Sequence, residues 1–256
     1  MMAKGNGKLP AELDAAFAED AGLGLEEVTT KDMQIPFLRI LQALNPQLKK
    51  SDPAFIENAS QGDVFNTVTN KTWGGEDGVT VIPVHFMMKM NEWIPRSAGG
   101  GFVGELSPDS DVVRKAVRDP DTGMEVLPHG NELVRTAQHY VKIVHEDGTL
   151  ENAIVDMKKT QLKISRKWNT LIAMQKHNGS VLPSFANTYI LKSVEGGNDK
   201  GSWYSWSVSI GGRIPSMEAY GECKELHSSI RKGELQIVPP PSDMMLEDQS
   251  SDEVPF

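Results

Sequence analysis

The stretch that decides the fold is residues 78–95, which reads GVTVIPVHFMMKMNEWIP. It is rich in β-branched and aromatic residues, which favour β-strands. Runs of the same kind recur along the chain, several of them followed by Gly, Asn or Asp turns, at residues 62–70, 132–145, 150–157, 183–197 and 201–212. The sequence therefore predicts an α+β fold that is mainly β.

Helical patterns surround these strands. We expect a short amphipathic helix near residues 11–20, the clearest helix at residues 158–177 with Thr160 as its N-cap, and a last helix near residues 215–231. Residues 31–49 also predict a helix, because apolar side chains follow Pro36 at helical spacing, namely Phe37, Ile40, Leu41 and Leu44. This apolar stripe is expected to pack in the core.

The chain divides into three parts by composition. Residues 1–30 form a mobile acidic N-terminal arm, residues 31–238 a folded core, and residues 239–256 a proline spacer with a disordered acidic tail. Within the core, residues 96–131 are rich in Gly, Asp and Pro and predict a long loop. A loop of this length in a compact domain is usually functional or disordered.

The negative charge lies at the two ends. The chain has 35 acids and 26 bases, but residues 1–32 hold seven acids against three bases, and residues 242–256 hold five acids and no base. The remaining middle has 23 of each, so the acidic pI does not exclude a nucleic-acid partner. With one cysteine, no apolar run near 20 residues and no signal-peptide pattern, we expect a cytoplasmic protein with no membrane partner.

Catalytic motifs are missing from the sequence. The six histidines show no HExxH spacing, and neither a phosphate-binding GxxxxGK[ST] loop nor a GxSxG elbow occurs. His139 and His145 bracket one expected strand. We expect each of them to be hydrogen-bonded or exposed to solvent, which is a better interpretation than a metal site. We therefore expect no enzyme activity, no metal site and no cofactor.

Several aromatic residues stand in polar surroundings, where they could stack on unpaired bases. On the strand SWYSWS, alternation places Tyr204 and Trp206 on one face with Val208, and Trp203 on the other. One of these faces must be core; Trp206 is expected in it, and Trp203 is left open between core and solvent. The stacking candidates are Trp73, Trp93, Phe102, Trp203 and Tyr204.

The helix expected from residue 158 onward begins with a basic segment. Five bases and no acid occur between residues 158 and 168, so one helix face is strongly basic. A solvated surface face is the alternative, although such a face usually carries compensating acids. Seven residues are candidates for phosphate contacts: the five bases of this segment, and two bases from the preceding region. They are Lys89, Arg96, Lys158, Lys159, Lys163, Arg166 and Lys167.

The acidic end closes with DEVPF at residues 252–256. This motif resembles the C-terminal tip of bacterial single-stranded DNA-binding proteins, with Val254 in place of isoleucine. The resemblance implies that the tip binds partner enzymes through an apolar pocket with a basic rim, and that the acids can also occupy the protein's own basic groove. The alternative is an arbitrary acidic tail. The partner-binding candidates are Asp252, Glu253, Val254, Pro255 and Phe256.

The body is similar to a tailed-phage family of single-stranded DNA-binding proteins over residues 31–240. The segments that carry this resemblance are QIPFLRILQALNP, GDVFNTVT, VIPVHF, TQLKISRKWNTLI and GSWYSWSV. It implies an OB-like barrel with added helices and disordered acidic termini. The expected function is sequence-nonspecific binding of single-stranded DNA in phage replication and recombination, in the host cytoplasm, by a protein that could be a homo-oligomer.

Two other functions stay open. One is a single-strand annealing or recombination mediator protein. The other is a regulatory protein that docks on a host factor through its tail and has no affinity for DNA.

Overall fold

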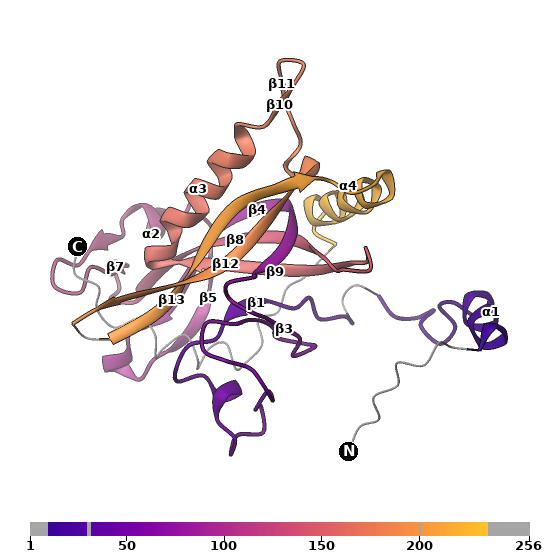
Figure 1. Ribbon diagram of the computed structural model, residues 1–256. Coiled ribbons are helices and arrows are strands. Elements are labelled where there is room, and N and C mark those ends of the chain that lie inside the picture. The colour runs from indigo at the N-terminus through magenta and orange to yellow at the C-terminus, as the bar shows by residue number, and fades with distance from the viewer. Residues whose placement is uncertain (1–9, 30–31, 200, 235–256) are drawn as a thin grey trace.

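One large antiparallel sheet forms the body of the protein (Figure 1). The computed structural model describes residues 10–29, 32–199 and 201–234. The strand order is β13 (Gly201–Arg213), β12 (Asn187–Asn198), β4 (Val79–Ile94), β8 (Glu132–Val144), β7 (Glu125–Val126) and β6 (Val117–Arg118). In addition, β5 (Gly101–Leu106) pairs with β4, and β9 (Leu150–Lys158) pairs with β8.

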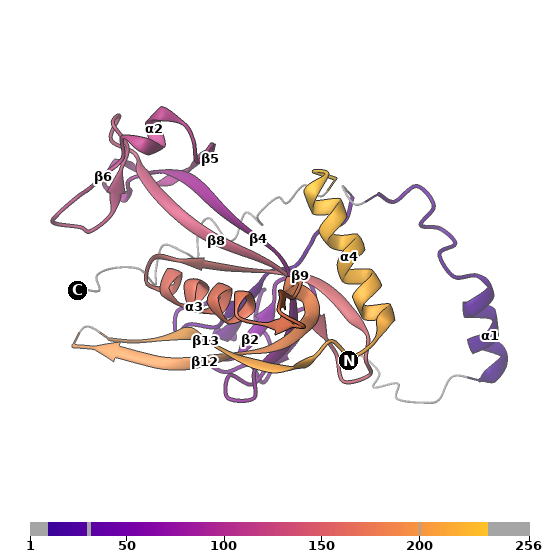
Figure 2. The ribbon, with the colours of Figure 1, turned by 90° about the horizontal axis from the view of Figure 1, so that it is seen from above.

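The sheet is curled into a half-barrel. Figure 2 shows the β12–β13 hairpin and the β4–β8 pair diverging like two arms, with helix α3 (Leu162–Ala173) between them. The main core lines this half-barrel, where Val81, Val141, Tyr189 and Leu191 are fully buried. The mainly β, α+β class is confirmed, and the curl is compatible with an OB-like fold.

Helix α3 fills the open side of the half-barrel, and α4 (Met217–Arg231) covers the opposite face of the sheet. Trp168 of α3 is fully buried in the main core, whereas Cys223 of α4 packs with Ile82 and Val84 of β4. Both helices are confirmed, but α3 is shorter than the expected 158–177 at both ends: it ends at Ala173, before the strand Lys176–His177, and it begins at Leu162. Its N-cap is Gln161, preceded by a 3-10 turn at Lys159–Gln161, so Thr160 is not the N-cap.

The prediction of a helix at residues 31–49 is wrong. This segment forms β1 (Leu38–Ile40), in a small sheet with β2 (Val64–Asn66) and β3 (Thr72–Trp73), and the 3-10 turn Pro46–Leu48. Phe37 packs on Tyr140 and Ile154, whereas Leu38 enters the main core. Two successive side chains are thus buried on opposite sides, as a strand allows and a one-faced helix does not. Most of the apolar stripe is buried as expected, but Leu44 is exposed.

Residues 96–131 are not an irregular loop. They form the 3-10 turn Arg96–Ala98, β5, helix α2 (Asp111–Arg114), β6 and β7. Val113 and Leu127 from this segment bury against Met90 and Leu133 at the far ends of β4 and β8. These apolar residues stand in short isolated pairs, Val112 with Val113 and Val126 with Leu127, within a polar sequence, which is why the pattern indicates a loop.

Two elements project from the body. Helix α1 (Ala11–Glu19) confirms the short helix expected near residues 11–20, and it lies away from the sheet in both views (Figures 1 and 2). The hairpin of β10 (Lys176–His177) and β11 (Ser180–Val181) follows α3, and the turn Ser184–Ala186 leads into β12. None of the helices in the described ranges is long and apolar enough to cross a membrane. The expectations for residues 1–9 and for the tail 239–256 lie outside the described residues.

Candidate nucleic-acid interface

Strand register brings predicted DNA-binding residues together on one face of the sheet. Lys89 of β4 lies directly across from Thr136 of β8, which in turn lies across from Lys158 of β9. Trp93 is four residues beyond Lys89 on the same strand and therefore points to the same side. Its partner on β5 is Phe102. We call Lys89, Trp93, Phe102 and Lys158 the aromatic sheet face.

Trp93 and Phe102 form an aromatic pair at the end of this face. Their ring centroids are 5.3 Å apart in an edge-to-face arrangement, and both side chains are half-buried. Trp93 Nε1 is buried and has no hydrogen-bond partner in the described part of the chain. Arg96 follows in an exposed 3-10 turn just beyond the strand. Aromatic rings held on paired strands with a nearby cation suit stacking of bases.

The strand under Trp93 is fixed by its neighbour Glu92. The Glu92 carboxylate is buried and accepts hydrogen bonds from Asn131 Nδ2 at 2.5 Å and from His129 Nε2 at 2.6 Å. These hydrogen bonds, that of Asn131 first, lower the pKa of Glu92 and keep it charged. The position of Trp93 is therefore set by contacts made on the other face of β4.

Lys89 is already ion-paired within this face. Its Nζ lies 2.9 Å from both carboxylate oxygens of Glu105, and the lysine side chain is 21% exposed. A phosphate at this position would have to share Lys89 with Glu105. The charge available here is therefore smaller than the sequence suggested.

The exposed side of α3 carries a second basic surface. Lys163, Arg166 and Lys167 are exposed, while Ser165 and Trp168 on the inner side are buried. Among the described residues, none pairs with the side chain of Lys163 or Lys167, and Arg166 Nε donates only to the Leu162 carbonyl at 3.3 Å.

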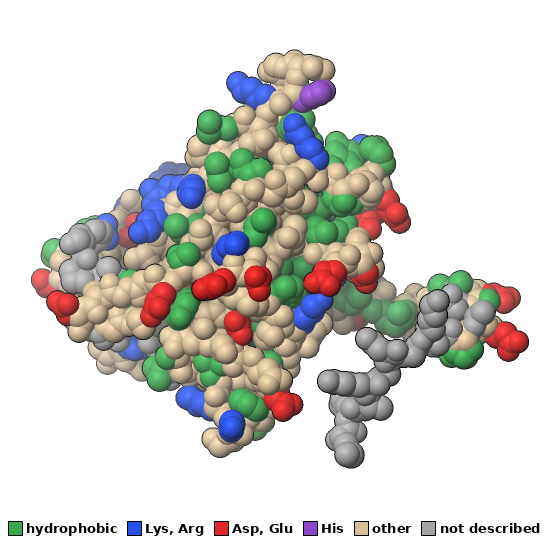
Figure 3. All heavy atoms as spheres, in the orientation of Figure 1, with side chains coloured by type: hydrophobic (Ala, Val, Ile, Leu, Met, Phe, Trp, Pro, Cys, Tyr) green, Lys and Arg blue, Asp and Glu red, His purple; other side chains and the backbone are tan. Residues whose placement is uncertain are grey.

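The β10–β11 hairpin extends this surface with exposed Lys176, which is not among the residues predicted from the sequence. The signal that could have found it is the absence of any acid from residue 157 to residue 194. We call Lys163, Arg166, Lys167 and Lys176 the α3 ridge. Figure 3 shows Lys and Arg side chains gathered over α3 and a band of acids below them.

The structure separates this ridge from Lys158. Lys158 is the last residue of β9, and Lys159 lies in the 3-10 turn, so neither belongs to the helix. His139 of β8 stacks on Trp168 of α3, whereas Thr136, three positions earlier, faces Lys158 on the opposite side of the sheet. The single basic helix face predicted at residues 158–167 is therefore divided between two surfaces.

Trp73 and Trp203 lie apart from the aromatic sheet face. Trp73 packs against the main core, and its ring stacks on that of His145, with centroids 6.4 Å apart. Trp203 is half-buried over Gly196, where an added Cβ would lie 3.3 Å from Trp203 Nε1. Trp206 is buried, as expected.

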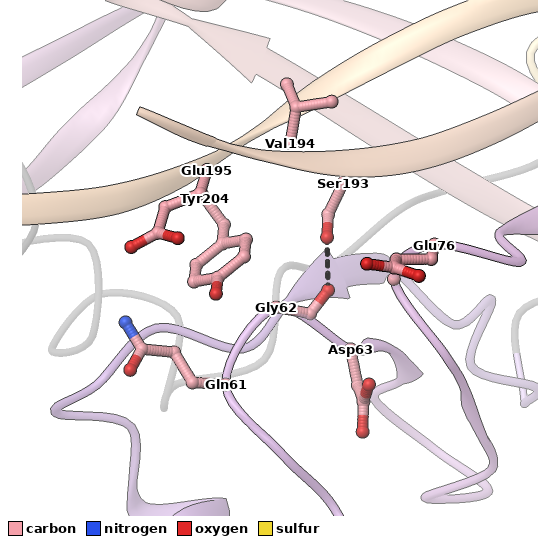
Figure 4. A pocket seen from close by; sticks show the side chains of 9 residues that line it. Gln61, Gly62, Asp63, Glu76, Ser193, Val194, Glu195 and Tyr204 are labelled. Atoms are coloured by element: carbon pink, nitrogen blue, oxygen red, sulfur yellow. Dashed lines mark hydrogen bonds between the residues drawn. The ribbon is translucent and has the colours of Figure 1, made fainter. Parts of the chain in front are cut away.

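Tyr204 lines a pocket of about 460 Å³ whose walls are acidic. Figure 4 shows its ring beside Glu195, with Ser193 donating a hydrogen bond to the Gly62 carbonyl. The other lining residues include Asp63 and Glu76. Clustered carboxylates repel phosphate, so this pocket does not extend the aromatic sheet face.

The described residues contain no group of three His, Cys, Asp or Glu side chains that could hold a metal ion. His139 and His145 do not share a site, because each has a different partner. The buried His139 forms a hydrogen bond of 2.8 Å between its Nε2 and Ser165 Oγ, and His145 forms one of 2.9 Å between its Nε2 and Glu151 Oε2.

A family model described as Pam3 phage gp34-like protein matches residues 4–236. No curated protein and no solved structure matches the chain.

Proposed function

This chain belongs to the Pam3 phage gp34-like protein family, and we propose that it binds single-stranded DNA without sequence preference. The observation that carries the proposal is the aromatic sheet face. There, the Trp93–Phe102 pair shares one side of paired strands with Lys89 and Lys158. Every base offers a π-face to an aromatic ring, and every nucleotide offers a phosphate to a cation, so such a surface tolerates any sequence.

The α3 ridge supplies additional positive charge. Its side chains are exposed, and in the described part of the chain no carboxylate neutralises Lys163 or Lys167. Binding to phosphates there would release counterions and so strengthen attachment at low salt. The ridge and the aromatic sheet face lie on different sides of the sheet, so we propose that a strand passes from one to the other around β9 and α3.

We also propose a role for the protein once the strand is bound. It carries out no reaction of its own, needs no cofactor, and acts in phage replication or recombination in the host cytoplasm. Residues 252–256 recruit partner enzymes, since an apolar ring behind acids fits a pocket with a basic rim.

Titration with oligo-dT tests the proposal directly. The oligonucleotide should quench tryptophan fluorescence through stacking, and the affinity should fall steeply as salt rises. The matched control is an abasic oligonucleotide of equal length, which keeps the phosphates and lacks the bases. It should bind more weakly and quench little.

If neither oligonucleotide binds, the protein is not a DNA-binding protein, and docking on a host factor becomes the better interpretation. Faster pairing of complementary strands in the same samples would identify an annealing protein.

A further inference from the structure

The arm that carries α1 exposes apolar side chains and is strongly acidic. The part of this arm that the structure describes, residues 10–29, contains six acids and no base, and the two bases of the arm are Lys4 and Lys8. Phe17 is 57% exposed, and Leu13, Leu23 and Leu25 are also exposed. In both ribbon views the arm stands clear of the sheet (Figures 1 and 2). Grouped apolar side chains that none of the described residues covers are typical of a binding segment.

The α3 ridge offers the opposite charge together with apolar side chains. Lys163, Arg166 and Lys167 are exposed along the helix, and Met174 at its end is 68% exposed. Val181 in the adjoining hairpin is 60% exposed. The ridge therefore complements the arm in charge and in apolar surface. Its cations can pair with the carboxylates of the arm, and its exposed apolar groups at one end can cover Leu13 and Phe17.

We propose that the acidic arm of one copy of this protein docks on the α3 ridge of a second copy. The arm joins the body where Phe37 bridges to Ile154 of β9, and α1 lies beyond α4, on the far side of the molecule from the start of α3 (Figure 2). The arm of each copy is thus directed away from that copy's own ridge. Charge attraction steers the contact, and burial of the apolar side chains holds it.

Docked arms and DNA would use the same cations. An arm on the ridge excludes phosphate from it, so single-stranded DNA should displace the arm and dissociate the assembly. The docking itself requires no DNA, and it is measured without any. A failure of the arm contact and a failure of DNA binding are therefore distinguishable.

Cross-linking between two variants that each carry one added, exposed cysteine tests the contact. The native Cys223 is buried and does not compete for the reagent. Phe17→Cys on one tagged copy and Met174→Cys on a differently tagged copy should give a mixed cross-linked species with a short bis-maleimide. Met217→Cys, which replaces a methionine that is 82% exposed on α4, is the matched control and should give several-fold less. Equal yields with Met174→Cys and with Met217→Cys would overturn the proposal. A double variant with Phe17→Cys and Met174→Cys on one chain would also overturn it if it cross-linked only within that chain.

Charge reversal provides a second, independent measurement. Light scattering of the full chain at low salt should show an assembly larger than a monomer, which shrinks as salt is added. The triple variant Lys163→Glu, Arg166→Glu and Lys167→Glu should be monomeric. The control with the same change in charge at exposed positions elsewhere, Lys49→Glu, Lys50→Glu and Lys115→Glu, should assemble like the parent protein.

Mixing restores the contact if the pairing is correct. A variant with Glu12→Lys, Glu19→Lys and Asp20→Lys in the arm should be monomeric by itself, and it should assemble when it is mixed with the reversed-ridge variant. A parent protein that is monomeric at low salt, or an arm reversal that changes nothing, contradicts the proposal.

Discussion

The indole ring of Trp168 stacks on the imidazole ring of His139, with centroids 4.4 Å apart and 20° between the planes. Both side chains are buried, and His139 is also hydrogen-bonded to Ser165 at 2.8 Å. This contact joins α3 to β8 at the centre of the half-barrel. The ridge on the outer side of α3 is therefore held in place by a stack on its inner side.

Removal of the buried indole tests that anchor. Trp168→Ala should lower the free energy of unfolding by about 3–5 kcal/mol, because the cavity lies in the main core. Urea denaturation followed by circular dichroism measures the change. Trp203→Ala is the control, and because Trp203 is only half-buried it should cost clearly less. Equal losses would mean that α3 does not depend on this contact.

The burial of His139 predicts that the free energy of unfolding falls in acid. Burial lowers the pKa of His139 to about 3, whereas the unfolded chain keeps the ordinary value of about 6.5. As the pH falls from about 6.5 toward 3, the unfolded chain binds a proton that the folded protein excludes. The free energy of unfolding should then fall by at most about 1.4 kcal/mol per pH unit from this residue.

Denaturation of His139→Gln at several pH values isolates this effect. The variant should show a shallower decline than the parent protein over the same range, whatever its stability at neutral pH. An identical slope would show that His139 does not titrate between the two states. The comparison also removes the contribution of His85, whose pKa is lowered by burial as well.

The α3 ridge should affect DNA binding through charge alone. Changing Lys163, Arg166 and Lys167 to Ala should weaken binding to dT, dA and dC oligonucleotides about equally. The slope of log K against log salt should become shallower by about 2, since each phosphate contact on a single strand contributes about 0.7. Alanine at Lys49, Lys50 and Lys115 is the control. An unchanged slope would assign the ridge to the solvated surface.

The aromatic sheet face should affect DNA binding through stacking. Trp93→Ala and Phe102→Ala should each weaken binding by about 1–3 kcal/mol with little change in the salt slope. Trp93→Phe should retain most of the affinity and lose much of the fluorescence quench. If the quench persists in Trp93→Phe, another tryptophan contacts the bases, and the assignment of this face is wrong.

The acidic tail supplies the last prediction, although it lies outside the described residues. Deletion of residues 242–256 should raise the affinity for single-stranded DNA, most strongly at low salt, because five negative charges no longer compete with phosphate. Phe256→Ala keeps those charges and should leave DNA affinity unchanged while partner binding falls. A deletion that lowers DNA affinity would place the tail in the DNA site or in the fold.

Local patterns were sufficient for much of the fold. The long strands, α3 and α4 are recognisable because their residues repeat with the period of a strand or a helix over many positions. Alternation along the strand also predicts the buried position of Trp206, since it places this residue on the same face as Val208. The basic start of the segment at residue 158 is equally visible, because charge is a property of each residue by itself.

Contacts between distant parts of the chain decided the rest. Residues 37–41 have a helix-like spacing, but the bridge from Phe37 to Ile154 and the pairing of Leu38 with Asn66 make them a strand. The pairing of Trp93 with Phe102, and the position of Lys158 opposite Thr136, depend on register between strands. Register is set by where turns and bulges place whole strands, so no single segment contains it. The sequence alone therefore named the aromatic and basic residues, while the tertiary structure decided which of them share a surface.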